Sequence, residues 1–389
     1  MPGGRTAHSR FKIPLNCNGG TSCTITKQSC TAKLLRMASL ILWDEATMTK
    51  RQAVEALNNS MRDIMGRQDR PFGVNTIVFA GDFRQVLLVV RRGSRGQIID
   101  ATLRSSHLYM GMHLLSLVTN MRAHDDTWFA DYLLRVGNGT EEVDDQGNIR
   151  LPEDICVSST TEGDDLENLI DHVFPRLDDN MSDLNYMTSR SILSTMNNNV
   201  NKINIPMVES FRGEEVIYHS FDNAEDDPYG YYATEFLNGL TPNGLPLHAL
   251  KLKLNCPVIL VRNMIQLMVC VTRRGLWCKV LRGMPSMQKS FKRRQFPVRL
   301  NFAMTINKAQ GQTILIVGMY LPNPVFSHGQ LYVALSRATA KKNIKILIEK
   351  ENKKENTKKQ TGKSKKRKRP TLSLQTSMKN IIYEEVLTG

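Results

Sequence analysis

The stretch SLILWDEATM, residues 39–48, decides the fold, because a short apolar run is followed directly by two carboxylates. A second stretch of the same kind, NTIVFAGDFRQ, occupies residues 75–85. Between them lies KRQAVEALNNSMRDIMG, residues 50–66, whose apolar residues recur at helical spacing. Strands that alternate with helices predict an α/β fold with a parallel sheet, in which polar side chains gather at the carboxyl ends of the strands.

The two carboxylates after the first run are Asp44 and Glu45. In an NTPase, the first acid can hold Mg²⁺ on the nucleotide phosphates and the second can polarise the attacking water. The alternative is structural, because acidic residues are also favoured in the first turn of a helix. After the second run, the Gln85 amide can orient water or sense a γ-phosphate. Its structural alternative is a simple turn at Gly81 and Asp82.

Further polar groups later in the chain are candidates for the same chemistry. Arg122, in LVTNMRA, and Arg337, in SHGQLYVALSRAT, can stabilise charge in phosphoryl transfer, although one arginine on a helix is usually a surface residue. The run NFAMTINKAQGQT, residues 301–313, is either a ligand-binding segment or a polar strand-to-helix turn. Its polar and glycine positions are Thr305, Asn307, Lys308, Gln310, Gly311 and Gln312.

The composition fits an intracellular globular protein with a polyanionic partner. The chain has 389 residues, is 41% hydrophobic and carries a formal net charge of +15. Its seven Cys residues include no Cys-x-x-Cys pair, which argues against a zinc ribbon and a disulfide framework. No stretch approaches the roughly 20 apolar residues of a membrane span, so no membrane partner is expected. The block KSKKRKRP, residues 363–370, favours the nucleus, although such arms are also commonly solvated or grip nucleic acid.

Changes in pattern divide the chain into five parts. Residues 1–140 carry the first α/β pattern, residues 141–229 an acidic connection and the start of a second, and residues 286–349 the remainder of the second. Residues 230–285 are β-like, with Pro and Gly turns, and predict a small β-rich insertion. Residues 350–389 form a basic tail that is expected to be disordered.

Taken in order, these segments resemble the Pif-type (petite integration frequency) ATP-dependent DNA helicases of superfamily one, especially the Helitron-related versions of plant genomes. The matching segments are MPGGRTAHSRFKIPL, LILWDEATM, IVFAGDFRQVLLVV, LVTNMRA, SILSTMNNNVNKIN, RRQFPVRLNFAMTINKAQGQT and HGQLYVALSRAT. The resemblance implies two RecA-like domains, a small β-barrel in the second, ATP and Mg²⁺ as cofactors, and 5′ to 3′ movement along single-stranded DNA. Duplex junctions are expected partners. Family members act in DNA repair, DNA recombination and telomere maintenance.

The resemblance also implies a role for each matching residue. Asp44 is expected to bind Mg²⁺, Glu45 to activate water, and Gln85 to sense the γ-phosphate. Arg122 and Arg337 are expected to be arginine fingers. The residues expected to contact the nucleotide are Asp44, Gln85, Gly311 and Arg337, and those expected to contact DNA are Thr305, Asn307, Lys308 and Gln310.

One motif of the family, the glycine-rich phosphate-binding loop with Gly-Lys-Thr, is expected before the segment that begins at Met1, and this sequence lacks it. The tail segment Thr361–Ser364 is only a superficial match, because Thr357 stands where the first Gly belongs and no apolar strand precedes it. Two hypotheses follow: an ATP-dependent DNA helicase, or a catalytically inactive, transposon-derived remnant that only binds single-stranded DNA. A viral or plasmid motor of another family is a third, and the segments around Lys308 and Arg337 argue against it.

Overall fold

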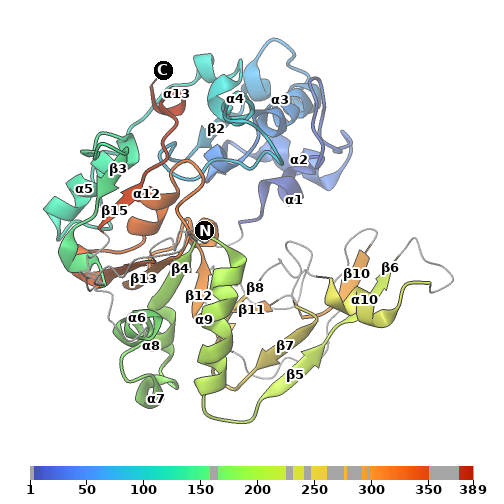
Figure 1. The fold of residues 1–389 in the computed structure, drawn as a ribbon. Helices are drawn as coiled ribbons and strands as arrows, with labels where there is room; N and C mark the ends of the chain where they lie inside the picture. The colour runs from blue at the N-terminus through green and yellow to red at the C-terminus, as the bar shows by residue number, and fades with distance from the viewer. Residues whose placement is uncertain are drawn as a thin grey trace, which may run out of the picture.

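The computed structural model describes most of the chain. The described residues are 4–157, 165–224, 231–240, 247–260, 276–277, 291–296, 298–349 and 376–388. Figure 1 shows an N-terminal lobe, a second lobe built on a larger sheet, and a β-rich part that extends from the second lobe. None of the helices within the described ranges is long and apolar enough to cross a membrane.

The N-terminal lobe, residues 4–111, is built on two parallel strands. Strand β1 (Leu40–Trp43) pairs with β2 (Thr76–Phe79) in parallel. Ile41 and Trp43 are buried while Leu40 and Leu42 are exposed, which is the alternation of a strand with one covered face. The other elements of the lobe are α1 (Ala7–Phe11), α2 (Cys30–Met37), η1 (Ala46–Met48), α3 (Arg51–Met65), η2 (Pro71–Val74), α4 (Arg95–Asp100), η3 (Leu103–Ser105) and η4 (Tyr109–Gly111).

Helix α3 supplies much of the core of this lobe. Its buried residues Val54, Leu57 and Met61 recur at three- and four-residue spacing and share a core with the buried side chains of β1. The helix ends at Gly66, whose φ of 66° is a left-handed conformation that glycine adopts without strain. The predicted order of strand, helix and strand is confirmed for this lobe.

The second lobe, residues 127–157, 165–210 and 301–349, carries a sheet of four parallel strands in the order β12–β4–β13–β14. These strands are β4 (Arg190–Ser194), β12 (Ala303–Thr305), β13 (Ile316–Leu321) and β14 (Ile344–Ile348). Helices lie on both faces, as an all-parallel sheet requires. One face is covered by α6 (Asp165–Val173) and α9 (Asn197–Ser210), the other by α5 (Thr127–Asn138) and α12 (Gln330–Leu335). The shorter elements are η5 (Glu153–Ile155), α7 (Leu177–Asn180), α8 (Leu184–Thr188), α11 (Ile306–Ala309) and η6 (Lys341–Asn343).

Helix α5 lies on the second lobe, although the sequence placed it in the first domain, residues 1–140. Its buried Phe129 and Tyr132 share a core with Leu331 and Val333 of α12. Packing therefore groups α5 with the second lobe.

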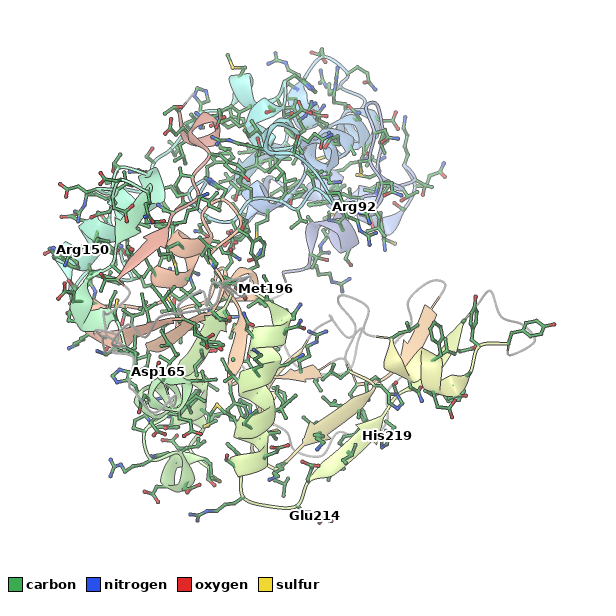
Figure 2. The ribbon with its side chains drawn as sticks, in the orientation of Figure 1. Arg92, Arg150, Asp165, Met196, Glu214 and His219 are labelled. Carbon is green, nitrogen blue, oxygen red and sulfur yellow. The ribbon has the colours of Figure 1, made fainter. Side chains whose placement is uncertain are left out.

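The β-rich part extends beyond both predicted borders, residues 230 and 285. Its antiparallel pairs are β5 (Val216–His219) with β7 (Ala249–Leu252), β6 (Phe221–Ala224) with β10 (Phe291–Arg294), and β8 (Pro257–Leu260) with both β9 (Leu276–Trp277) and β11 (Val298–Leu300). Helix α10 (Thr234–Gly239) lies between them in sequence. In Figure 2, Glu214 and His219 lie at the end of the molecule away from the N-terminal lobe. Much of the predicted insertion lies outside the described residues.

The end of the chain corrects the expectation of a wholly disordered tail. Strand β15 (Ser377–Lys379) pairs antiparallel with β3 (Asn148–Arg150), and α13 (Glu384–Leu387) follows it. Met378 is buried in the core of the second lobe, and this burial fixes the segment in place. The basic run itself, residues 350–375, lies outside the described residues.

Candidate active site

The two carboxylates stand at the carboxyl end of β1. The Ala80 amide donates to the Trp43 carbonyl and the Ala46 amide to the Ala80 carbonyl, both at 2.9 Å, so this strand end is fixed against β2. Asp44 is exposed and accepts a hydrogen bond from the Glu45 amide at 3.0 Å. Glu45 is half-buried, with a left-handed backbone of φ 54° and ψ 40°. Helix η1 begins at the next residue, but the Glu45 side chain does not cap it, so the structural alternative does not explain this carboxylate.

Asp82 organises the loop that follows β2. Its Oδ1 accepts hydrogen bonds from the Arg84 amide at 3.0 Å and from Arg84 Nε at 2.8 Å. Its Oδ2 accepts a hydrogen bond from the Tyr332 hydroxyl of α12 at 3.1 Å. The Gln85 amide donates to the Asp82 carbonyl at 3.1 Å. The turn that the structural alternative expects is present, and its aspartate also joins the two lobes.

Gln310 connects the run 301–313 to the first strand end. Helix α11 ends at Ala309, and Gln310 and Gly311 follow, the latter with a φ of 75°. The buried Gln310 side chain donates from Nε2 to Glu45 Oε2 at 3.1 Å. The run predicted to respond to DNA therefore touches the carboxylate predicted to be the base.

Arg337 lies in the interior, just after α12. Its side chain is 1% exposed, so the alternative of a surface arginine is wrong. The guanidinium donates to the carbonyls of Val333 at 2.9 Å and Gln312 at 3.0 Å, and to Ser336 Oγ at 2.9 Å. These acceptors come from α12, from Ser336 just after it and from the run 301–313, so Arg337 holds these segments together.

Arg122 reaches Ser336 from the segment before α5. Its Nη1 donates to the Ser336 carbonyl at 2.9 Å, and its Nε donates to Thr313 Oγ1 at 3.1 Å. Arg122 and Arg337 thus share Ser336 as a neighbour, and the structure brings the two predicted arginine fingers together.

Electrostatic interactions connect the arginines with the carboxylates. Burial and, secondly, the positive charge of Arg122 lower the pKa of Arg337 to about 10, against the opposing effects of Tyr332, Glu45 and Asp82. Burial also lowers the pKa of Arg122, against Tyr332 and Glu45. Both guanidinium groups remain charged near neutral pH. The site therefore offers two positive charges beside a carboxylate, an arrangement that suits a phosphate group.

The residues expected to contact DNA differ in their surroundings. Thr305 precedes α11 without capping it, and Asn307 Oδ1 accepts a hydrogen bond from the buried Gln330 Nε2 at 3.2 Å. Lys308 is exposed as a whole residue, yet partial burial and, secondly, the nearby Arg299 lower its pKa to about 8. Within this set, Lys308 is the residue with a positive charge to offer to a phosphate.

The described residues fit a nucleotide with Mg²⁺ but not a metal bound by protein alone. Among them, no group of three or more His, Cys, Asp or Glu could hold a metal ion. Mg²⁺ usually takes one or two carboxylates together with phosphate oxygens, and Asp44 is an exposed carboxylate in the right place. Two buried amide oxygens, Gln85 Oε1 and Gln310 Oε1, lack a hydrogen-bond partner in the described structure. Such acceptors are normally satisfied by a ligand or water.

Sequence reasoning missed three residues around the start of α12. His328 forms a hydrogen bond with the Phe83 carbonyl at 2.7 Å, and Tyr332 binds the loop aspartate as described above. Gly329 has a φ of 67°, and a Cβ at this position would lie 2.2 Å from the Arg84 carbonyl oxygen. Tyr332 lies within α12, whereas His328 precedes the left-handed Gly329 at its start, so helical periodicity was a signal for Tyr332 alone.

Carboxylates at the end of a parallel strand, facing a buried and a half-buried arginine beside a second parallel sheet, are typical of RecA-like nucleotide-binding proteins. Family profiles narrow the class. Residues 1–147 match the profile described as PIF1-like helicase, and residues 235–269 match that of the DNA helicase Pif1 2B domain. Both matches support a Pif1-type helicase, as the order of the motifs predicted.

Short segments are also similar to curated helicases. Over 64 residues the chain is 45% identical to the ATP-dependent DNA helicase PIF1 of Emericella nidulans, and this match covers 16% of the chain and 8% of that protein. Over 55 residues it is 46% identical to the ATP-dependent DNA helicase PIF1 of Homo sapiens, covering 14% of the chain and 8% of the relative. The matches therefore span only a small fraction of the length of these relatives.

Solved Pif1 helicases share the fold over most of the chain. A structure concerned with unwinding at forked double-stranded DNA by two coordinating Pif1 helicases gives a TM-score of 0.61 at 20% identity, covering 88% of this chain and 78% of that one. Bacteroides Pif1 bound to single-stranded DNA gives a TM-score of 0.58 at 20% identity, covering 88% and 79%. At this identity the likeness concerns the fold, and it confirms the predicted RecA-like architecture.

Proposed function

We propose that this chain forms the body of an ATP-dependent DNA helicase, which couples ATP hydrolysis to movement along single-stranded DNA and to unwinding. The hydrogen bond from Gln310 to Glu45, 3.1 Å long, carries this proposal. It joins a carboxylate of the N-terminal lobe to the run 301–313 of the second lobe. A shift of this run on DNA would therefore change the surroundings of the carboxylate, which is the coupling that a motor needs.

Each site residue has a chemical task in this proposal. Asp44 holds Mg²⁺, which offsets the charge of the nucleotide phosphates. Glu45 takes the proton of the attacking water, and Gln85 orients that water through its amide. Arg122 and Arg337 stabilise the charge that develops on the transferred phosphoryl group. The left-handed Gly311, beside Gln310, allows the backbone to approach the nucleotide closely.

Single-stranded DNA and duplex junctions are the proposed partners. Lys308 supplies positive charge for the phosphates, and contacts of this kind give affinity that is sensitive to salt and largely independent of sequence. The 5′ to 3′ direction rests on the family resemblance. The single-stranded DNA in the structure of the Bacteroides relative supports the choice of partner.

A nuclear location and work in DNA repair, recombination and telomere maintenance complete the proposal. The basic block at residues 363–370 supports nuclear import, and the family resemblance supports the processes. A fluorescent fusion of the full chain, compared with one in which this block is replaced by Ala, tests the location. A fusion whose distribution ignores the replacement would contradict the role of the block.

The activity is tested by ATP hydrolysis, measured with Mg²⁺ and single-stranded DNA added separately and together. We expect hydrolysis to need both and to fall by about a hundredfold or more in Glu45→Gln, since the amide cannot accept the proton. Glu142→Gln, which changes an exposed acid, serves as the matched control. Salt-sensitive binding of single-stranded DNA without hydrolysis would favour the alternative function, a protein that only holds the strand.

A further inference from the structure

The C-terminal strap, as we name residues 376–388, begins on the second lobe. Strand β15 pairs with β3, and the Leu151 amide donates to the Thr376 carbonyl at 2.6 Å. The Asn380 side chain donates to the Val136 carbonyl at the end of α5, at 2.8 Å. In Figure 1 the strap rises from β15, beside β3, to α13, beside α4.

The other end of the strap is bound to the N-terminal lobe. Glu385 forms an ion pair with Arg95 of α4 at 2.6 Å, and the Arg95 guanidinium lies 4.7 Å from the centre of the Tyr383 ring. Arg104 of η3 donates to the Val386 carbonyl, and the Val386 side chain is 0% exposed. The strap therefore contacts both lobes, and a buried apolar side chain lies near each of its ends, Met378 and Val386.

His328 lies between the strap and the Phe83–Gln85 loop. The Tyr383 amide donates to His328 Nδ1 at 2.8 Å, which requires that Nδ1 carry no proton. Nε2 then carries the proton and donates to the Phe83 carbonyl at 2.7 Å. The residue is 2% exposed, so water does not compete for either bond. One neutral ring thus links the strap to the loop.

Gly329 makes the second link between the same two segments. Its amide donates to the Ile381 carbonyl of the strap at 3.0 Å. On the other side, a Cβ at this position would lie 2.7 Å from the Gln85 carbonyl oxygen, so the loop backbone rests directly on the glycine. Movement of the strap would therefore be passed to the backbone of Gln85.

We propose that the C-terminal strap is a positioning element, which through His328 and Gly329 holds the Phe83–Gln85 loop where Gln85 faces the nucleotide. The proposal rests on the proposed function for the role of Gln85 alone. When the strap is docked, the loop is fixed; when the strap leaves, the loop loses two of its supports. The end of the chain thereby controls a loop that is almost three hundred residues earlier in sequence.

Hydrogen exchange on the full chain tests this proposal without requiring ATPase activity. Val386→Asp places a charge in a fully buried position and undocks the strap. We expect exchange to accelerate by about tenfold or more in residues 376–388 and also in residues 83–88, with β13 unchanged as an internal control for folding. Thr388→Asp adds the same charge at an exposed position and should leave all three regions as they are. Faster exchange in the strap with an unchanged loop would overturn the proposal.

Two conservative replacements of His328 separate its two bonds. In His328→Asn, the amide oxygen can replace Nδ1 as the acceptor of the hydrogen bond from the Tyr383 amide. In His328→Gln, the amide nitrogen can replace Nε2 as the donor to the Phe83 carbonyl. We expect His328→Asn to loosen the loop alone and His328→Gln to loosen both the strap and the loop. If the protein hydrolyses ATP, kcat should fall by about tenfold in both variants while KM for ATP changes little. Unchanged loop exchange in both variants would exclude His328 as a positioning residue, whatever the ATPase result.

Discussion

Gln310 Nε2 donates to Glu45 Oε2 over 3.1 Å, so a buried amide after α11 fixes the carboxylate at the end of β1. The two residues are 265 positions apart in sequence. A carboxylate that accepts a hydrogen bond is held in one rotamer, and its distance from an attacking water then depends on the donor. The position of the second lobe therefore bears directly on the proposed base.

Loss of this bond should weaken the coupling between DNA and hydrolysis. Gln310→Ala removes the donor, and we expect the DNA-stimulated rate of ATP hydrolysis to fall by about tenfold, which corresponds to one hydrogen bond to a charged group. The comparison is the ratio of the rates with and without single-stranded DNA. Gln312→Ala is the control, because Gln312 Nε2 binds the Lys308 carbonyl and not the carboxylate. If the ratio of the two rates is unchanged in Gln310→Ala, the hydrogen bond from Gln310 to Glu45 does not couple DNA binding to hydrolysis.

Arg337 should contribute strongly to stability as well as to the proposed chemistry. Arg337→Ala leaves the carbonyls of Val333 and Gln312 without their donor and opens a cavity, so we expect the free energy of unfolding to fall by about 3 kcal/mol. Urea denaturation at an unchanged m-value measures the difference. Arg150→Ala, on the exposed edge of β3, should change stability by less than about 0.5 kcal/mol. If the free energy of unfolding falls by a similar amount in both variants, the hydrogen bonds of Arg337 add little to the stability of the fold.

DNA affinity should depend on pH through Lys308. Its pKa of about 8 in the free protein means that the ammonium loses its proton as the pH rises through 8, and the attraction to phosphate is lost with it. We expect affinity for single-stranded DNA to fall between pH 7 and pH 9, by at most about tenfold per pH unit for one group. Lys308→Arg should remove this dependence because the guanidinium stays charged. Lys342→Arg, at an exposed lysine, should retain it.

Acid should release the strap from His328. Burial lowers the pKa of His328 below its ordinary value, ahead of the effects of the Phe83 carbonyl, Arg95, Asp82 and Glu385. The folded protein therefore holds fewer protons at this residue than the unfolded chain does. Its contribution to stability is present above the unfolded value, about 6.5, and is lost as the pH falls through the folded value.

The corresponding measurement is the free energy of unfolding between pH 7.5 and pH 5. The free energy of unfolding should change less steeply with pH in His328→Asn than in the parent chain, since Asn does not titrate in this range. His124→Asn, at an exposed histidine, should keep the parent slope. Equal slopes in all three proteins would contradict a neutral His328.

Local sequence patterns predicted the helices and strands that follow one another directly along the chain. The apolar run before Asp44, the amphipathic run of α3 and the second run before Gln85 became β1, α3 and β2. Parallel pairing then brought the polar residues to one edge, as expected for strands of an α/β sheet. These features depend on periodicity, which is written in the sequence.

Contacts between distant segments left no such signal. The strap pairs Ser377–Lys379 with Asn148–Arg150, and strands of three residues carry no recognisable alternation. Charge was also a poor guide to burial. Arg337 is charged yet buried, and the carbonyls that accept its hydrogen bonds come together only in the folded chain. The Tyr332–Asp82 bond likewise depends on how α12 meets the loop after β2. Tertiary packing, rather than local preference, decides each of these cases.

At Glu45, the stability of the backbone conformation and the side chain that the proposed chemistry needs call for different residues. A left-handed conformation is unfavourable by about 1–2 kcal/mol for a residue with a Cβ, whereas Gly adopts it freely. At φ 54° a glycine would relax the chain, but it would also remove the carboxylate. Selection for a more stable protein and selection for hydrolysis would therefore pull this one position in opposite directions. The chain keeps a carboxylate at this strand end in a backbone conformation that favours Gly.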